Sequence, residues 1–151
     1  MSEWFVIKLE PGPGNAQKWP SGDIYVAVNG GGALAYKDYM LLAPGLENAE
    51  RFRWEDKQGE YLIDSEGWYL GYDGPSGCLK RHYKGLSSYW MPIQSGNVWH
   101  LADTGSNRVV SWDPNQKWPL ASTTTFLQEF DAGDKYALAV ELLASSPPKP
   151  M

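Results

Sequence analysis

Short apolar runs separated by polar, glycine-containing turns recur along the chain and predict strands. The runs Ile24 to Val28, Tyr61 to Ile63 and Val98 to Leu101 each lead into a turn rich in Gly, Asn or Asp and then into a second apolar run. Two β-rich runs joined by such a turn are typical of a β-hairpin. The 16 Gly and 11 Pro are scattered between these runs, which suits many tight turns and predicts no long helix. The pattern therefore predicts an all-β protein.

The hairpin pattern repeats with a spacing of roughly 38 residues, which indicates three similar units. The units cover about residues 23–59, 60–97 and 98–143. Each unit holds a hairpin, a shorter apolar pair and a closing aromatic strand, which makes about four strands per unit. In the third unit the closing strand is either Phe126 to Phe130 or the later KYALAVELL, and we favour the later one. The second strands of the three hairpins contain Leu34 to Tyr36, Trp68 to Tyr72 and Val109 to Trp112.

Three four-stranded units, each too small to bury its own apolar face, can close around a pseudo-threefold axis as a β-trefoil. We expect one such domain over residues 1–144, in which 1–22 form an added N-terminal segment and WFVIKLE an added strand or extended arm. The proline-rich residues 145–151 are expected to be disordered. The expected shared core consists of Leu34, Phe52, Trp54, Leu70, Trp90 and Val110.

Composition and charge exclude several classes of protein. The net charge of −5 and one small basic cluster do not supply the broad positive face that a nucleic acid needs. No apolar run approaches the length of a membrane span, and no leader pattern is seen, so we expect a cytoplasmic protein. Cys78 is the only cysteine, which excludes an intrachain disulfide, and we interpret it as a small buried or half-buried residue and not as a nucleophile.

The chain carries one string that looks catalytic, Asp103-Thr104-Gly105-Ser106, the signature of aspartic proteases. Those enzymes need two carboxylates and a supporting apolar-apolar-Gly strand, and no such strand follows Asp103. We therefore interpret these residues as a hairpin turn. His82 and His100 are the only histidines, and neither lies in a cluster with ligand spacing. The sequence predicts no enzymatic activity, no metal and no cofactor.

Aromatic residues near the predicted turns are the remaining functional signal. Sugars bind by stacking on an aromatic ring while carboxylates and amides take the hydroxyl groups. The hairpin turns of the second and third units combine these groups, and they predict a site in which acidic or amide groups accept hydroxyls and Trp rings stack. The same aromatic residues could instead pack the fold or form a protein interface. The candidate ligand-binding residues are Asp64, Trp68, Tyr72, Asp103, Asn107 and Trp112.

The stretch YLGYDGPSGCLKRHYKGLSSYWMPI of the second unit resembles ricin-B-like β-trefoil proteins. It is similar to the smaller haemagglutinin component of clostridial neurotoxin complexes, through Tyr69–Leu70, Tyr72–Asp73, Tyr89–Trp90 and Pro92–Ile93. In kind, the chain also looks similar to the mushroom tyrosinase light subunit and its mannose-binding relative. The resemblance implies a partner that is a carbohydrate, including mannose-type glycans, or a glycoprotein, or else a larger protein to which the chain attaches as an accessory subunit.

The chain departs from the ricin-type pattern in its Gln-x-Trp signature. Gln17-Lys18-Trp19 and Gln116-Lys117-Trp118 match the three letters, but both fall in predicted loops and not in closing strands. A third class, the trefoil protease inhibitors, projects one exposed reactive loop, and Pro11 to Trp19 could serve as one. We therefore expect a lectin-like binding protein, with the accessory subunit as the main alternative and the inhibitor as a lesser one.

Overall fold

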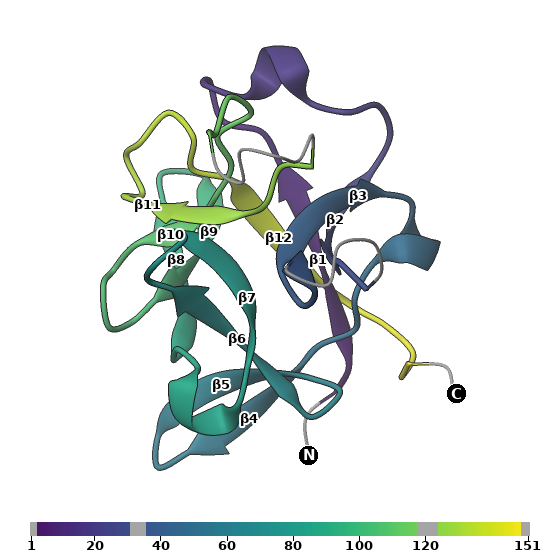
Figure 1. The fold of residues 1–151 in the computed structure, drawn as a ribbon, viewed down its shortest axis with the longest axis vertical. Coiled ribbons are helices and arrows are strands. Elements are labelled where there is room, and N and C mark those ends of the chain that lie inside the picture. The colour runs from purple at the N-terminus through teal and green to yellow at the C-terminus, as the bar shows by residue number, and fades with distance from the viewer. Residues whose placement is uncertain (1–2, 31–35, 118–123, 149–151) are drawn as a thin grey trace.

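The computed structural model describes residues 3–30, 36–117 and 124–148. Within them the protein is all-β: twelve strands joined by tight turns, with three short 3-10 helices and no α-helix, which confirms the predicted class (Figure 1). The helices are η1 (Ala16–Lys18), η3 (Leu46–Asn48) and η4 (Lys84–Leu86). The strands are β1 (Phe5–Glu10), β2 (Ile24–Val28), β3 (Met40–Pro44), β4 (Arg53–Lys57), β5 (Glu60–Ser65), β6 (Trp68–Asp73), β7 (Cys78–His82), β8 (Trp90–Ser95), β9 (Val98–Asp103), β10 (Val109–Ser111), β11 (Gln128–Phe130) and β12 (Ala139–Ala144).

The strands form two antiparallel sheets whose pairing repeats three times. One sheet has the order β12-β1-β2-β3 and the other β4-β5-β6-β7-β11-β10-β9-β8. In every group of four, the first strand pairs with the second and the second with the third. The fourth strand pairs with the first strand of another group: β4 with β5, β8 with β9, and β12 with β1. The groups cover residues 5–57, 60–95 and 98–144.

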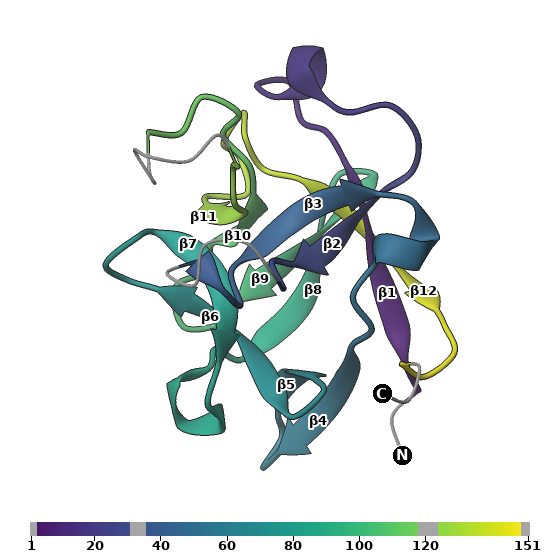
Figure 2. The ribbon, with the colours of Figure 1, turned by 45° about the vertical axis from the view of Figure 1, so that its right-hand side comes forward.

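Strand β1 corrects the expected start of the first unit. It lies between β12 and β2 as the first strand of its group, with Phe5, Ile7 and Leu9 buried, so it is neither an arm nor peripheral (Figure 2). Ile24–Val28 is consequently the second strand, and its partner is Met40–Pro44 in place of the expected second strand that contains Leu34. Leu34 itself lies outside the described residues.

The third unit closes as favoured from the sequence. β12 overlaps the last five residues of KYALAVELL, extends to Ala144, and pairs along its whole length with β1. The alternative run contains β11, which is the third strand of its group. At the C-terminus, residues 145–148 follow β12, and the Ser145 N–H donates to the Trp4 carbonyl at 2.9 Å. The structure thus places part of the segment that we expected to be disordered.

A single large core joins the two sheets. Phe52, Leu70, Trp90 and Val110 are buried in it as expected, and Trp54 packs against it half-buried. The sheets are joined at Phe5, whose N–H and C=O exchange two 2.8 Å hydrogen bonds with Phe52. The third strands also meet, because the Leu127 N–H donates to the Met40 carbonyl and the Leu79 N–H to the Leu127 carbonyl. The core therefore lies between the three groups and not within any one of them.

Candidate functional site

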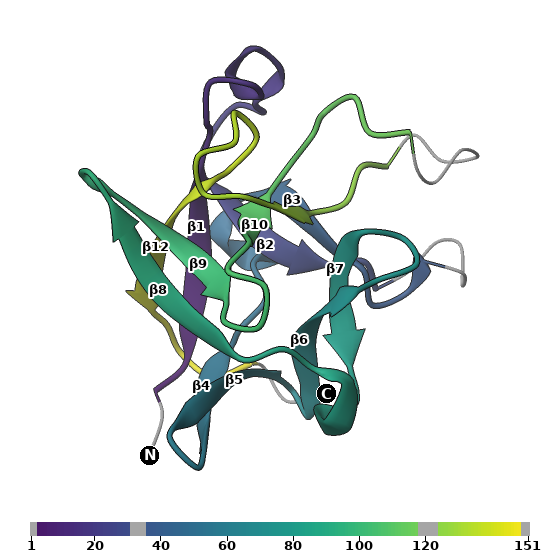
Figure 3. The same ribbon diagram turned by 90° about the vertical axis from the view of Figure 1, so that its left-hand side faces the viewer.

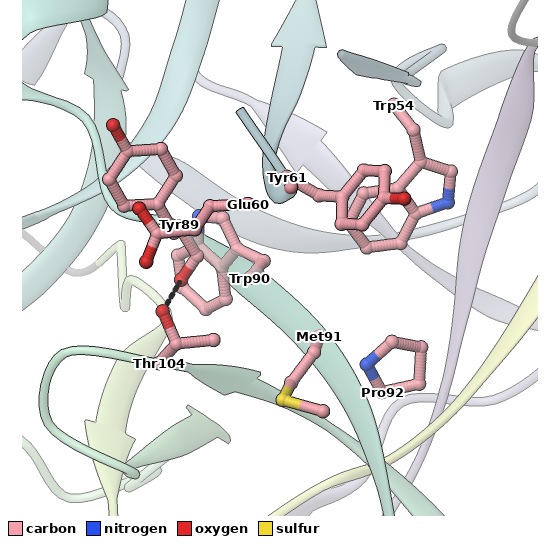
Figure 4. A pocket seen from close by; sticks show the side chains of 9 residues that line it. Trp54, Glu60, Tyr61, Tyr89, Trp90, Met91, Pro92 and Thr104 are labelled. Carbon is pink, nitrogen blue, oxygen red and sulfur yellow. Dashed lines mark hydrogen bonds between the residues drawn. The ribbon is translucent and has the colours of Figure 1, made fainter. Parts of the chain in front are cut away.

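An aromatic cleft of about 590 Å³ lies between the β4–β5 hairpin and strand β8. Its position follows from strand register. Directly opposed residues of an antiparallel pair share one face. Trp54 is opposite Ile63 and Tyr61 is opposite Asp56, so Trp54 and Tyr61 share the face that carries the buried Ile63. Figure 3 shows this hairpin beside the longer β8–β9 hairpin. The aromatic and apolar lining residues are Trp54, Tyr61, Tyr89, Trp90, Met91 and Pro92 (Figure 4).

The cleft has a buried floor and exposed walls. Trp90 is 1% exposed, and its indole N–H donates to the Leu70 carbonyl at 2.9 Å, which fixes the orientation of the ring. Trp54 meets Tyr61 edge to face with centroids 6.2 Å apart, at an angle of 83°. Tyr61 and Met91 are 46% and 49% exposed. An exposed tyrosine held against a packed tryptophan is a preorganised surface for a flat apolar ligand face.

Polar groups lie at the edge of the cleft. The Glu60 side chain is exposed and carries the one charge among the lining residues (Figure 4). Thr104 also lines the cleft, and its N–H and its hydroxyl both donate to the Tyr89 carbonyl, at 2.9 and 3.3 Å. The described lining of the cleft thus combines an aromatic wall with a carboxylate acceptor and includes no Lys or Arg.

The two candidate aspartates hold turns. Asp64 Oδ1 accepts the Gly67 N–H at 2.7 Å and Oδ2 accepts the Arg53 Nε–H at 2.8 Å. Asp103 Oδ1 accepts the Gly105 N–H at 2.9 Å, while Oδ2 accepts the Ser88 hydroxyl at 3.0 Å. Both carboxylates are buried. They therefore serve as turn caps, and 103–106 form the turn that the sequence predicts, without a free carboxylate edge for a sugar hydroxyl.

Trp112 lies in the core and not at a surface. Its side chain is 5% exposed, its indole N–H donates to the Thr125 hydroxyl at 2.9 Å, and Trp19 meets it edge to face at 5.7 Å. A stacking residue needs an open ring face. Trp112 offers none in this structure, so the expectation that it stacks on a sugar is corrected to a packing role.

The other three candidates lie outside the aromatic cleft. Trp68 is 36% exposed and packs against the more exposed Tyr83, with ring centroids 5.0 Å apart. Tyr72 is half-buried beneath the Arg108 guanidinium, 5.0 Å from the ring centroid. Asn107 occupies the β9–β10 turn with φ of 61°. The fold thus brings Tyr72 near the turn of Asp103 and Asn107, while Asp64 and Trp68 stay together at the β5–β6 turn.

A pair of carboxyl groups lies behind the β9–β10 turn. Glu129 on β11 is 3% exposed, and its Oε1 accepts a long, 3.4 Å hydrogen bond from the Ser106 hydroxyl. Its Oε2 finds no donor among the described residues. Burial, and then the neighbouring Asp103 carboxylate, raise the pKa of Glu129 to about 8, against the opposing effects of Arg108 and Ser106. Glu129 therefore keeps its proton to a higher pH than an exposed glutamic acid does, and Asp103 is the neighbouring acceptor for that proton.

The raised pKa of Glu129 predicts a stability that falls with pH. Below the ordinary pKa of 4.5 the carboxyl is protonated in both the folded and the unfolded chain. From there to about 8 only the folded chain keeps the proton, so the free energy of unfolding decreases by up to about 1.4 kcal/mol per pH unit. Glu129→Gln should remove this dependence in urea unfolding at pH 5, 7 and 9. Equal slopes for variant and wild type would contradict the assignment.

The described residues hold neither an activated cysteine nor a cluster that could bind a metal. Burial raises the pKa of the Cys78 thiol to about 11, which leaves it neutral and poorly nucleophilic. No group of three or more His, Cys, Asp or Glu side chains in residues 3–30, 36–117 and 124–148 is arranged to hold a metal ion. Among the same residues, no helix has the length and apolar character needed to cross a membrane.

Comparison with known proteins finds no match to this sequence, either among protein-family models or among curated proteins. The cleft is thus the feature on which a function can be argued. Sequence reasoning missed Tyr61 and Glu60, although alternation along β5 contained a signal. Tyr61 shares a strand face with Ile63, yet it lies near the exposed end of the strand, where an aromatic side chain has no core to fill.

Proposed function

We propose that this chain is a non-catalytic, ricin-B-like β-trefoil that binds carbohydrate in the aromatic cleft. The threefold recurrence of strand pairing supports the fold, because four-stranded groups that pair first to second, second to third and fourth to first are what a trefoil requires. The added sequence resemblance of the second group points to the same class of protein.

The aromatic cleft is the single observation that carries the carbohydrate proposal. A pyranose has one apolar face and a rim of hydroxyl groups, and Tyr61 offers an exposed ring beside the packed Trp54. The Glu60 carboxylate lies within the same lining and can accept hydroxyl hydrogens. A volume of about 590 Å³ lies in the range of small-ligand sites. We propose neutral sugars, with mannose-type glycans tested first.

This proposal moves the stacking site from the β5–β6 and β9–β10 turns to the β4–β5 hairpin and strand β8. At those turns the carboxylates of Asp64 and Asp103 already accept hydrogen bonds from the chain itself, and the Trp112 ring is buried. Trp68 remains exposed at the β5–β6 turn, where the sequence predicted a sugar site. It therefore separates the two versions of the carbohydrate proposal in one experiment.

An accessory subunit without sugar binding is the second candidate, and one observation favours it. The β8–β9 hairpin exposes Met91, Val98 and Trp99, each more than 40% exposed. Because Trp99 is opposite Gln94 and Leu101 is opposite Pro92, Trp99 shares its face with Pro92 of the cleft lining. A partner protein could cover the cleft and this hairpin together.

Tyr61→Ala should abolish or reduce glycan binding by about tenfold or more, because it removes the exposed stacking ring. A glycan array identifies the best ligand, and calorimetric titration then measures its dissociation constant, expected in the micromolar to millimolar range for one shallow site. Trp68→Ala is the matched control, since it removes another exposed ring outside the cleft, and should leave the affinity unchanged.

The two variants also distinguish a wrongly placed sugar site from a protein that binds no sugar. Loss of binding with Trp68→Ala but not with Tyr61→Ala would return the site to the β5–β6 turn. Binding of no glycan, together with a stable complex with one larger protein that Trp99→Ala disrupts, would favour the accessory subunit and reject the lectin proposal.

A further inference from the structure

In both the β5–β6 turn and the β9–β10 turn, an aspartate carboxylate accepts a glycine N–H, but the charged group beside that carboxylate differs between the two turns. At the β5–β6 turn, Asp64 caps the Gly67 N–H and forms an ion pair with Arg53 at 2.8 Å. At the β9–β10 turn, Asp103 caps the Gly105 N–H and faces a second carboxyl group, that of Glu129. The Asp64 carboxylate is therefore balanced by the Arg53 guanidinium, whereas the Asp103 carboxylate faces an acidic group that must carry a proton to avoid repulsion.

The surroundings of Glu129 leave the proton as the one available link to Asp103. Glu129 is opposite Val110 in the β10–β11 pair and is buried, with Oε2 lacking any other donor among the described residues. The charged groups that act on it are Asp103 from β9 and Arg108 from the turn. The Arg108 guanidinium lies over the Tyr72 ring, at 5.0 Å from its centroid. Two carboxylate oxygens are both acceptors, so they attract each other only through a shared proton.

This carboxyl pair is connected directly to the wall of the aromatic cleft. Asp103 Oδ2 accepts the Ser88 hydroxyl, and Ser88 is the residue before Tyr89. On the other side, Thr104 follows Asp103 and donates twice to the Tyr89 carbonyl. The backbone at Tyr89 is thus connected to Asp103 in two ways: through Ser88, which precedes Tyr89, and through Thr104, which follows Asp103. Thr104 and Tyr89 both line the cleft.

We propose that the proton shared by Asp103 and Glu129 is a latch that holds the Thr104–Tyr89 wall of the cleft, and that ligand binding weakens when the proton leaves. The loss of the proton to solvent creates two buried negative charges that repel each other, and the turn loosens. Burial raises the pKa of Glu129 to about 8, so the latch opens under mildly alkaline conditions. The effect on ligand rests on the proposed function, but the latch itself does not.

Amide hydrogen exchange followed by NMR from pH 6 to 9.5 tests the latch without any ligand. The amides of Gly105 and Thr104 report directly, because they bond to Asp103 and Tyr89. After correction for intrinsic exchange, their protection should fall about tenfold or more, with a midpoint near the pKa of Glu129. Glu129→Gln should abolish the change, because its amide donates to Asp103 at every pH. The Gly67 amide, held by the Arg53-paired Asp64, is the internal control and should stay protected.

The possible results test three statements separately: that the latch exists, that it is connected to the cleft, and that the cleft binds a sugar. No transition for Gly105, or a transition that persists in Glu129→Gln, overturns the latch. A transition at Gly105 with none at Thr104 overturns its connection to the cleft. Where a glycan binds, its affinity should fall over the same pH interval in the wild type and stay constant in Glu129→Gln. Failure of every glycan to bind rejects the proposed function and leaves the exchange result standing.

Discussion

Trp90→Ala should lower the free energy of unfolding by about 3–5 kcal/mol, which is a large fraction of the stability of a domain this size. The side chain is among the largest that the core buries completely. Its removal leaves a cavity among residues from several strand groups, so no single group can relax to fill it. It also removes the shorter of two hydrogen bonds to the Leu70 carbonyl, at 2.9 Å, and leaves that carbonyl with the Ser88 N–H as a donor at 3.3 Å.

Urea unfolding followed by far-ultraviolet circular dichroism measures this loss. Trp68→Ala is the control, because it removes the same side chain from a position that is 36% exposed, and should cost about 1 kcal/mol or less. Similar costs for the two variants would show that Trp90 is not the floor of a packed core.

Arg81→Met should lower the free energy of unfolding by about 2–4 kcal/mol, because it leaves two shielded carboxylates without their cation. Arg81 on β7 forms ion pairs with Asp38 at 2.6 Å and with Glu50 at 3.2 Å. Its Nη1 also donates to the Ser65 hydroxyl, which in turn donates to Glu50 at 2.6 Å. One guanidinium therefore ties β7 and β5 to the residues before β3 and β4.

The matched control is Lys57→Met, which removes a cation from an exposed strand end and should change stability by less than about 0.5 kcal/mol. Adding Glu50→Gln to Arg81→Met should recover part of the loss, since it removes one of the two orphaned charges. A loss that Glu50→Gln leaves unchanged would mean that the methionine side chain packs badly and that charge is not the cause.

The hairpins of the second and third units could be predicted from sequence because their turns are determined locally, whereas the hairpin expected in the first unit was paired wrongly. Gln58–Gly59 and Glu66–Gly67 both adopt positive φ at two successive residues, the geometry of the turn that matches strand twist. Glycine at the second of these positions is a strong local signal. The closing strand of the third unit was also visible, because its apolar run is long enough to be distinguished from the shorter β11.

Strand β1 could not be aligned with its equivalents because its burial differs from theirs. β5 and β9 are exposed at their first two residues and buried at the last four, whereas β1 is buried from Phe5 and exposed at Glu10. That difference arises from β12 and Phe52, which lie elsewhere in the sequence and cover the start of β1. The residue pattern of β1 alone therefore does not reveal which distant residues will cover it.

The candidate site was misplaced for a related reason. An acidic residue before a glycine turn has the same local appearance whether it binds a ligand or caps the turn, and Asp64 and Asp103 do the latter. Trp112 was expected to stack on a sugar near the hairpin turn of the third unit, but Trp19 and Thr125 enclose it from distant segments. The cleft could not be predicted because its walls come from the β4–β5 and β8–β9 hairpins, which approach each other only in the folded chain.

The β1–β12 pair, which joins the two ends of the chain, has a consequence for the folding rate. Its contacts, from Phe5 with Ala144 to Glu10 with Ala139, have nearly the greatest sequence separation the chain allows. Such contacts raise the contact order and slow folding, because the entropy of closing the whole chain is lost before the pair forms. Until β12 pairs with it, β1 keeps one unpaired edge that carries apolar side chains, and such an edge is prone to wrong strand contacts.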